Sequence, residues 1–215
     1  GQKGAYIEAL AGTKNKLAVE PIRKLLDDRD PIVVAQAADA LGKLDARESI
    51  PRLRTLVEGQ NGLQRWAAAR SLSLMGDSGG VPFLRQMLVF DPAREVEGAI
   101  VTPGAADRLQ IDAAEALSPL GPNPDWMNPA RRLVGSPDPQ VRIIAPRLIA
   151  PQDQPLAKDV LESLLQDPNG GIREWATEVL PGRVAGDFVT LRRLVRSTDA
   201  YSRSLAAARI VELTR

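Results

Sequence analysis

The residues of this chain that could do chemistry are carboxylates, guanidinium groups and three tryptophans, because the sequence contains neither histidine nor cysteine. Without imidazole or thiolate groups, Ser-His-Asp triads, cysteine nucleophiles, disulfides and imidazole metal sites are all excluded. A site made only of carboxylates would still be possible. The carboxylates are scattered, however, and the sequence has no glycine-rich phosphate loop or calcium-binding loop. We therefore predict no catalytic residues, no metal site and no cofactor.

The charged residues contain one column whose sign alternates along the chain. If its members stack on neighbouring helices, each charge lies beside two opposite charges. We then expect a ladder of ion pairs between repeats, each worth at most about 1 kcal/mol but together fixing the stacking order. The alternative is that Arg70 and Arg147 contact a partner. The members of the column are Asp39, Arg70, Glu115, Arg147, Glu178 and Arg209.

A second column lies four residues earlier and holds mostly large apolar side chains. Side chains in such a column either pack in the core between neighbouring helices or form an exposed apolar strip that receives a partner helix or peptide. Trp66 is the strongest binding candidate because tryptophan is over-represented at interface hot spots. Ile111 and Ile143 are the other candidates of this strip. The full column is Ala35, Trp66, Ile111, Ile143, Glu174 and Leu205.

The elements that position these columns are two short amphipathic helices that recur along the chain. The pair is clearest in residues 49–57 (SIPRLRTLV) and 64–77 (QRWAAARSLSLMGD), which a polar turn separates. In the second helix of each pair, a small residue marks the packing face at positions 37, 68, 113, 145, 176 and 207. Apart from one insertion, the spacing is 31 or 32 residues. A fixed period of this size predicts an all-α, right-handed α-solenoid of about six two-helix repeats.

The period also predicts the domain organisation, a single repeat domain over residues 1–215. It begins with half a repeat, and the third repeat carries an insertion that could be a small hairpin or an ordered loop and could carry function. The chain would then open in the middle of a repeat, as in a domain of a larger protein. The predicted boundaries are 1–16, 17–46, 47–77, 78–122 with the insertion 90–104, 123–152, 153–183 and 184–215.

Two segments carry a family resemblance, VVAQAADALGKLD (33–45) and RWAAARSLSLMGD (65–77). Each follows an apolar helix, and together they resemble HEAT-like repeats, most closely the short bacterial kind first described in phycobilisome lyases. The resemblance implies a scaffold, an adaptor or an auxiliary lyase subunit; related folds include a DNA glycosylase and a deoxyhypusine hydroxylase. The hydroxylase needs histidine ligands, so this chain cannot share that chemistry. Arg65, Arg142 and Arg173, with Asp138 and Asp167 in the preceding turns, resemble the Asp–Arg bracing of HEAT-repeat turns, a structural role.

The first helices of the repeats carry a basic band. Its members suit the C-terminal halves of helices, where cations are favoured, and would form a solvated face. The alternative is that the band binds nucleic acid without sequence preference. A formal net charge of +1 gives no global sign of such binding. The band consists of Arg54, Arg85, Arg131, Arg132, Arg192 and Arg193.

From these patterns we predict a non-catalytic, monomeric scaffold that holds a protein or peptide partner. The contact residues would be Trp66, Ile111, Ile143, Arg70 and Arg147. The alternatives are nucleic-acid binding through the basic band and an auxiliary subunit of a lyase-type enzyme. No apolar run approaches the roughly 20 residues that span a bilayer. The missing cysteine fits a bacterial cytoplasm and a periplasm equally, and a start without methionine is compatible with removal of an N-terminal signal.

Overall fold

The computed structural model is built from helices, and the residues it describes contain no strand. They group into two compact units, which are taken one at a time below. Unit 1 comprises Gly1–Glu95 and Asp112–Trp126, and unit 2 comprises Val96–Ile111 and Met127–Arg215. The predicted all-α helical-repeat fold is thus confirmed, whereas the predicted repeat boundaries remain a prediction. The described residues are 2–13, 15–95, 102, 104–149, 160, 162–183, 191–192, 194–196 and 200–213.

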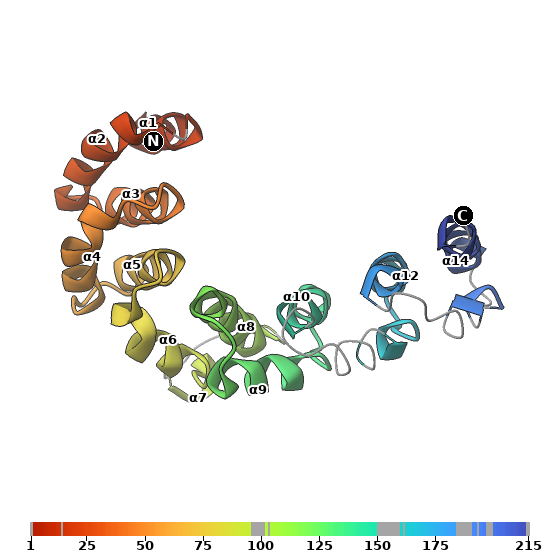
Figure 1. Cartoon of the computed structure of the whole chain (residues 1–215). Helices are drawn as coiled ribbons and strands as arrows, with labels where there is room; N and C mark the ends of the chain where they lie inside the picture. Colours follow the sequence, from red (N-terminus) through yellow and green to blue (C-terminus); the bar gives the residue numbers. More distant parts are fainter. Residues whose placement is uncertain are drawn as a thin grey trace. The chain divides into compact units, whose positions relative to one another are not determined.

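Unit 1 has two layers of helices, which Figure 1 shows in red to yellow. The inner layer holds the second helices of the repeats, α1 (Gln2–Gly12), α3 (Pro31–Lys43) and α5 (Gly62–Leu74). The outer layer holds the first helices: α2 (Val19–Lys24), α4 (Ile50–Val57) and α6 (Val81–Met87). Short 3-10 turns adjoin them: η1 (Lys16–Ala18), η2 (Leu25–Asp27), η3 (Arg47–Ser49) and η4 (Ser78–Gly80).

The second helices begin at side-chain caps. The Asp30 carboxylate accepts a hydrogen bond from the Ile32 amide at 2.9 Å, and Pro31 follows it in the first turn of α3. The Asn61 side chain accepts from the Gln64 amide at 3.1 Å and caps α5. Each cap satisfies an amide that has no partner within its helix, which sets the start of both helices.

The core lies between the two layers and is lined by small residues of the second helices. The predicted packing positions Ala37, Ala68, Ala113, Ala145 and Ala176 are all fully buried. Small side chains there let neighbouring helices approach closely. In the last repeat, the prediction is displaced by one residue: Ala206 is fully buried, whereas Ala207 is exposed.

The predicted arginines brace the turns, but through backbone carbonyls. The carboxylates of Asp138 and Asp167 pair instead with Arg108 and Arg142, one repeat earlier than predicted. The Arg65 guanidinium donates to the Val57 carbonyl at 2.9 Å, and Arg173 donates to the Asp167 carbonyl at 2.7 Å. Arg142 donates to the Ser136 carbonyl at 2.6 Å. These arginines satisfy carbonyls at the ends of first helices and tie each turn to the helix that follows.

Unit 2 contains helices whose core includes Leu164, Ile172, Leu191 and Leu194. Pro146 lies inside α10 and does not end it, since the helix continues to Ile149. Unit 2 includes α10 (Pro139–Ile149), α12 (Gly170–Arg183) and α14 (Ala200–Leu213). Two further helices contribute to both units: α8 (Ala105–Leu117) and α9 (Pro124–Leu133).

The insertion predicted at 90–104 begins with a short helix, α7 (Pro92–Glu95). The hairpin prediction falls on residues 95–102, most of which lie outside the described residues. After α8, the 3-10 turn η5 (Ser118–Leu120) leads toward α9. In the described part of the chain, no helix is long and apolar enough to cross a membrane.

Candidate functional site

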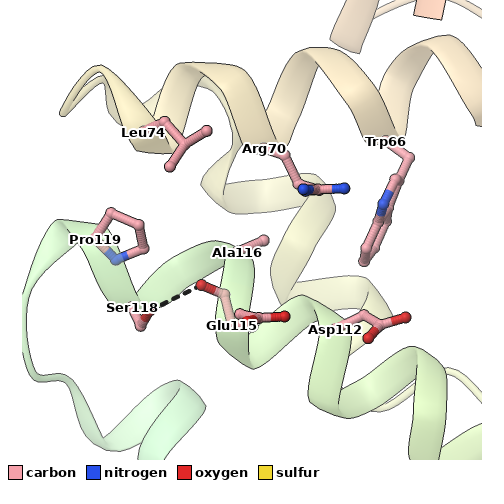
Figure 2. A pocket seen from close by; sticks show the side chains of 8 residues that line it. All are labelled: Trp66, Arg70, Leu74, Asp112, Glu115, Ala116, Ser118 and Pro119. Carbon is pink, nitrogen blue, oxygen red and sulfur yellow. Dashed lines mark hydrogen bonds between the residues drawn. The ribbon is translucent and has the colours of Figure 1, made fainter. Parts of the chain in front are cut away.

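Unit 1 contains a groove between α5 and the C-terminal half of α8, with a volume of about 380 Å³. From α5, Trp66, Arg70 and Leu74 follow one another at a spacing of four residues and form one wall. Figure 2 shows Trp66 and Arg70 reaching toward α8, with Leu74 at the Pro119 end. The opposite wall comes from α8 and η5 and consists of Asp112, Glu115, Ala116, Ser118 and Pro119.

The groove exists because α5 lies against its neighbours, α3 and the C-terminal half of α8 with η5, in different ways. On one side, α5 packs along α3, where the Ser71 hydroxyl donates to the Ala38 carbonyl at 2.8 Å. Gly42 permits this approach, since a Cβ atom there would lie only 2.7 Å from the Ser71 Cβ. On the other side, α5 packs on the turn η5 that follows α8. The side chains facing α8 are therefore left lining a hollow.

Trp66 is half-buried and held on one side by the outer layer. Its ring meets the Phe83 ring edge-on, with centroids 6.3 Å apart and an interplanar angle of 73°. The Arg65 guanidinium lies over the same Phe83 ring, 4.5 Å from its centroid. An edge-on aromatic pair of this kind contributes about 0.5–1.5 kcal/mol beyond burial. Trp66 is therefore a fixed wall of the groove.

The groove contains one guanidinium and two carboxylates, so its formal net charge is −1. Arg70 also acts on Asp39 of α3: burial raises the pKa of Asp39, and the positive charges of Arg70 and Lys43 offset part of that rise. Asp39 and Arg70 do not form an ion pair in the described structure, so the first rung of the predicted ladder is a longer-range attraction. The rungs at Glu178 and Arg209 have side chains outside the described residues and remain predictions.

The predicted apolar strip is not continuous. Ile111 is 0% exposed, so the prediction that it meets a partner is wrong; its side chain is core because it packs inward on α8. Ile143 is partly buried and packs against the core of unit 2 that includes Leu164 and Ile172. Arg147 is exposed, with its guanidinium 5.7 Å from the centroid of the Trp175 ring. Partner contact by Ile143 and Arg147 remains a prediction.

The predicted basic band is largely engaged in bonds within the chain. Arg54 pairs with Asp77 at 2.6 Å, and Arg85 pairs with Asp125 at 2.5 Å. The hydrogen bond from Arg54, stronger than the opposing effect of burial, lowers the pKa of Asp77. Such pairs remove the summed positive charge that phosphates require.

The remaining members of the band are in unit 2. Arg131 donates to the Asn128 side chain at 3.1 Å, and Arg132 donates to the Gln110 side chain at 2.9 Å. Arg192 is exposed, and Arg193 lies outside the described residues. Nucleic-acid binding by the band therefore remains a prediction without support from its paired members in unit 1.

Sequence reasoning missed Leu74, Asp112, Ser118 and Pro119 as groove residues. Leu74 carried a usable signal, because it follows Trp66 by eight residues and is therefore on the same helix face. The structure leaves it 50% exposed. The α8 side carried no such signal, since its approach depends on the insertion and on η5.

Unit 1 also contains a wider hollow between α1 and α3, of about 840 Å³. It is lined by small and charged residues, including Gly4, Gly12, Glu8 and Lys43, and has no aromatic wall. The hollow lies at the same register as the α5–α8 groove, two repeat steps earlier in the chain. The α1–α3 hollow therefore lacks the aromatic wall that makes the α5–α8 groove a binding candidate.

The helical pairs, their 31-residue register and the braced turns define a helical-repeat protein. Residues 3–64 match the family model for HEAT repeats. Residues 3–64 thus belong to the HEAT repeats, and this match confirms the resemblance seen in the sequence. None of the curated proteins matches it significantly.

Solved structures show the same kind of fold. One is the complex of CpcE and CpcF of phycocyanin lyase from Nostoc sp. PCC7120, with 21% identity, a TM-score of 0.50, and 98% of this chain and 85% of that chain covered. Another is an archaeal HEAT-like repeats protein from Thermococcus onnurineus NA1, with 19% identity, a TM-score of 0.45 and coverages of 97% and 92%. At these identities, the likeness concerns the fold alone.

Proposed function

We propose that the chain is a non-catalytic interaction scaffold and that the α5–α8 groove holds a side chain of a protein partner. The observation that carries this proposal is the groove itself, in which a fixed aromatic ring and an exposed leucine line one open hollow. Large aromatic side chains beside desolvated pockets are typical of interface hot spots. Helical-repeat folds present extended surfaces of this kind to their partners.

The sequence supports a role without catalysis, since it offers no imidazole and no thiolate. Two alternatives are less well supported. Nucleic-acid binding would need free cations on the first helices, whereas Arg54 and Arg85 are paired with carboxylates. The auxiliary-lyase alternative rests on a shared fold, which many unrelated functions use.

The proposal can be tested with two matched leucines of α5, each 50% exposed. Leu74 lines the groove, whereas Leu63, at the other end of the same helix, does not. We expect Leu74→Arg to abolish capture of a partner from lysate of the source cells and Leu63→Arg to leave capture intact. Both variants should keep the thermal midpoint of the unmodified chain within a few degrees. Equal capture by both variants would contradict the use of the groove.

A further inference from the structure

The charges around the groove distinguish the partners it could hold. Asp112 and Glu115 present two carboxylates on the α8 wall, against the single guanidinium of Arg70 on α5. The full chain has a formal net charge of +1, so this groove is more acidic than the molecule as a whole. An anionic side chain entering it would approach two like charges and gain one opposite charge. A cationic side chain would approach two opposite charges and only one like charge.

Arg70 does not cancel this preference, because its charge also acts outside the groove. It attracts the carboxylate of Asp39 on α3, which offsets part of the rise that burial causes in the pKa of Asp39. Glu115 is exposed and makes no side-chain hydrogen bond or ion pair with the rest of the described chain. Its carboxylate is therefore available to a cation that enters from outside.

The aromatic wall favours one kind of cation. The Trp66 ring is half-buried and fixed by Phe83, and it lines the same hollow as Glu115. A guanidinium is planar, stacks on aromatic faces and binds carboxylates through two parallel hydrogen bonds. An ammonium group contacts an aromatic face only as a point charge, and it binds a carboxylate only through single hydrogen bonds. The combination of an indole wall and a carboxylate thus suits arginine better than lysine.

The size of the hollow limits the occupant. At about 380 Å³, it is at the lower end of the roughly 300–1,000 Å³ of small-ligand sites. This is room for one long side chain with its neighbours, and too little for a whole helix. The aliphatic stem of such a side chain would extend from Trp66 toward the apolar end of the hollow, where Leu74 and Pro119 lie.

We propose that the α5–α8 groove recognises an arginine side chain of the partner, with its guanidinium between the Trp66 ring and the Glu115 carboxylate. The inference rests on the proposed function, because it names the chemistry of the contact that the scaffold makes. Asp112 adds a second negative charge beside this position. The positive charge of Arg70, one helical turn from Trp66, opposes this cation and keeps the contact weak.

The test uses blocked single amino acids as probes, so that no partner has to be known. The 215-residue chain is titrated with N-acetyl-arginine amide while the indole N–H resonance of Trp66, assigned with Trp66→Phe, is followed by NMR. We expect a saturable shift at millimolar concentrations that weakens as salt is added. N-acetyl-lysine amide should bind less tightly, and N-acetyl-glutamate amide should give no saturable shift.

Two charge variants locate the site. Glu115→Gln should weaken N-acetyl-arginine amide about fivefold, the effect of losing one exposed ion pair. Glu58→Gln removes an exposed carboxylate at the end of α4 and should leave the affinity unchanged. Equal affinity for the glutamate and arginine probes, or an unchanged affinity in Glu115→Gln, would overturn the proposal. If the arginine probe fails while Leu74→Arg still abolishes partner capture, the scaffold function stands and only the arginine assignment is lost.

Discussion

The two sides of α5 show how one repeat register can give a closed contact or an open one. Toward α3, Gly42 and Ser71 bring two helices together until a serine hydroxyl reaches a backbone carbonyl of the neighbouring helix. Toward α8, the other side of α5 carries Trp66, Arg70 and Leu74 around a hollow. On the α3 side, the small residues close the contact between the helices, so it is structural. On the α8 side, the large residues leave an open groove that is available for binding.

Wedging the closed contact apart is expected to cost more stability than any change at the open groove. Gly42→Ala places a Cβ within 2.8 Å of three atoms of Ser71, one of them the backbone Cα, so a helix must shift. We expect a loss of about 1–3 kcal/mol in the free energy of unfolding, measured by urea denaturation. The matched control is Gly62→Ala on α5, where a Cβ would meet no atom within 4 Å. That variant should be neutral or gain up to about 1 kcal/mol; a similar loss in both would show that the α3–α5 contact is not tight.

A smaller effect is expected from removing the fixed wall of the open groove. Trp66→Ala deletes a half-buried ring and its edge-on contact with Phe83. We expect a loss of about 1–2 kcal/mol in the free energy of unfolding and of binding to the arginine probe. Trp66→Phe should restore most of the stability. Complete unfolding of Trp66→Ala would mean that the ring is core and that the groove is not a surface feature.

The pair of Arg54 and Asp77 braces the turn after α5 from the outer side. Because the hydrogen bond from Arg54 lowers the pKa of Asp77, the ionised carboxylate stabilises the fold above its unfolded pKa near 3.8, and this contribution fades as pH falls through the folded pKa. Asp77→Asn can retain the cap on the Gly79 amide while losing the charge. We expect a modest loss of stability at pH 7 that shrinks toward pH 2, measured by urea denaturation. A difference that stays constant over this range would argue against the ion pair.

The smallest effect on stability is expected at the open end of the groove. Leu74 is 50% exposed, so Leu74→Ala should change the free energy of unfolding by less than about 0.5 kcal/mol. A fully buried leucine of the same helix, Leu72, should lose about 2–5 kcal/mol when changed to alanine. Similar losses at the two positions, measured by thermal and urea denaturation, would contradict the exposure of Leu74 at the groove.

The sequence predicted the repeat fold because its information is local and periodic. The buried alanines at 37, 68, 113, 145 and 176 follow directly from the 31-residue register and its single insertion. The turn bracing by Arg65 could be predicted for the same reason. The register does not say how closely two second helices approach each other.

The candidate site was therefore only half predictable. Trp66 and Arg70 stand out in their columns, but the same column wrongly assigned Ile111 to a binding surface, although its side chain is fully buried. Whether a column residue is core or groove depends on the neighbouring helix. Beside α5, that neighbour follows an insertion and is met through the turn η5, which no repeat pattern specifies.

The most direct test of the account is photo-crosslinking from the two ends of α5 in the source cells. A photoreactive benzoylphenylalanine at position 74 lies in the groove, and one at position 63 is equally exposed outside it. We predict a partner crosslink from position 74 that disappears when Trp66→Ala is added, and no crosslink to that partner from position 63. Crosslinks of equal yield from both positions, or one from position 74 that persists without Trp66, would contradict the central claim that the open side of α5 is the binding site.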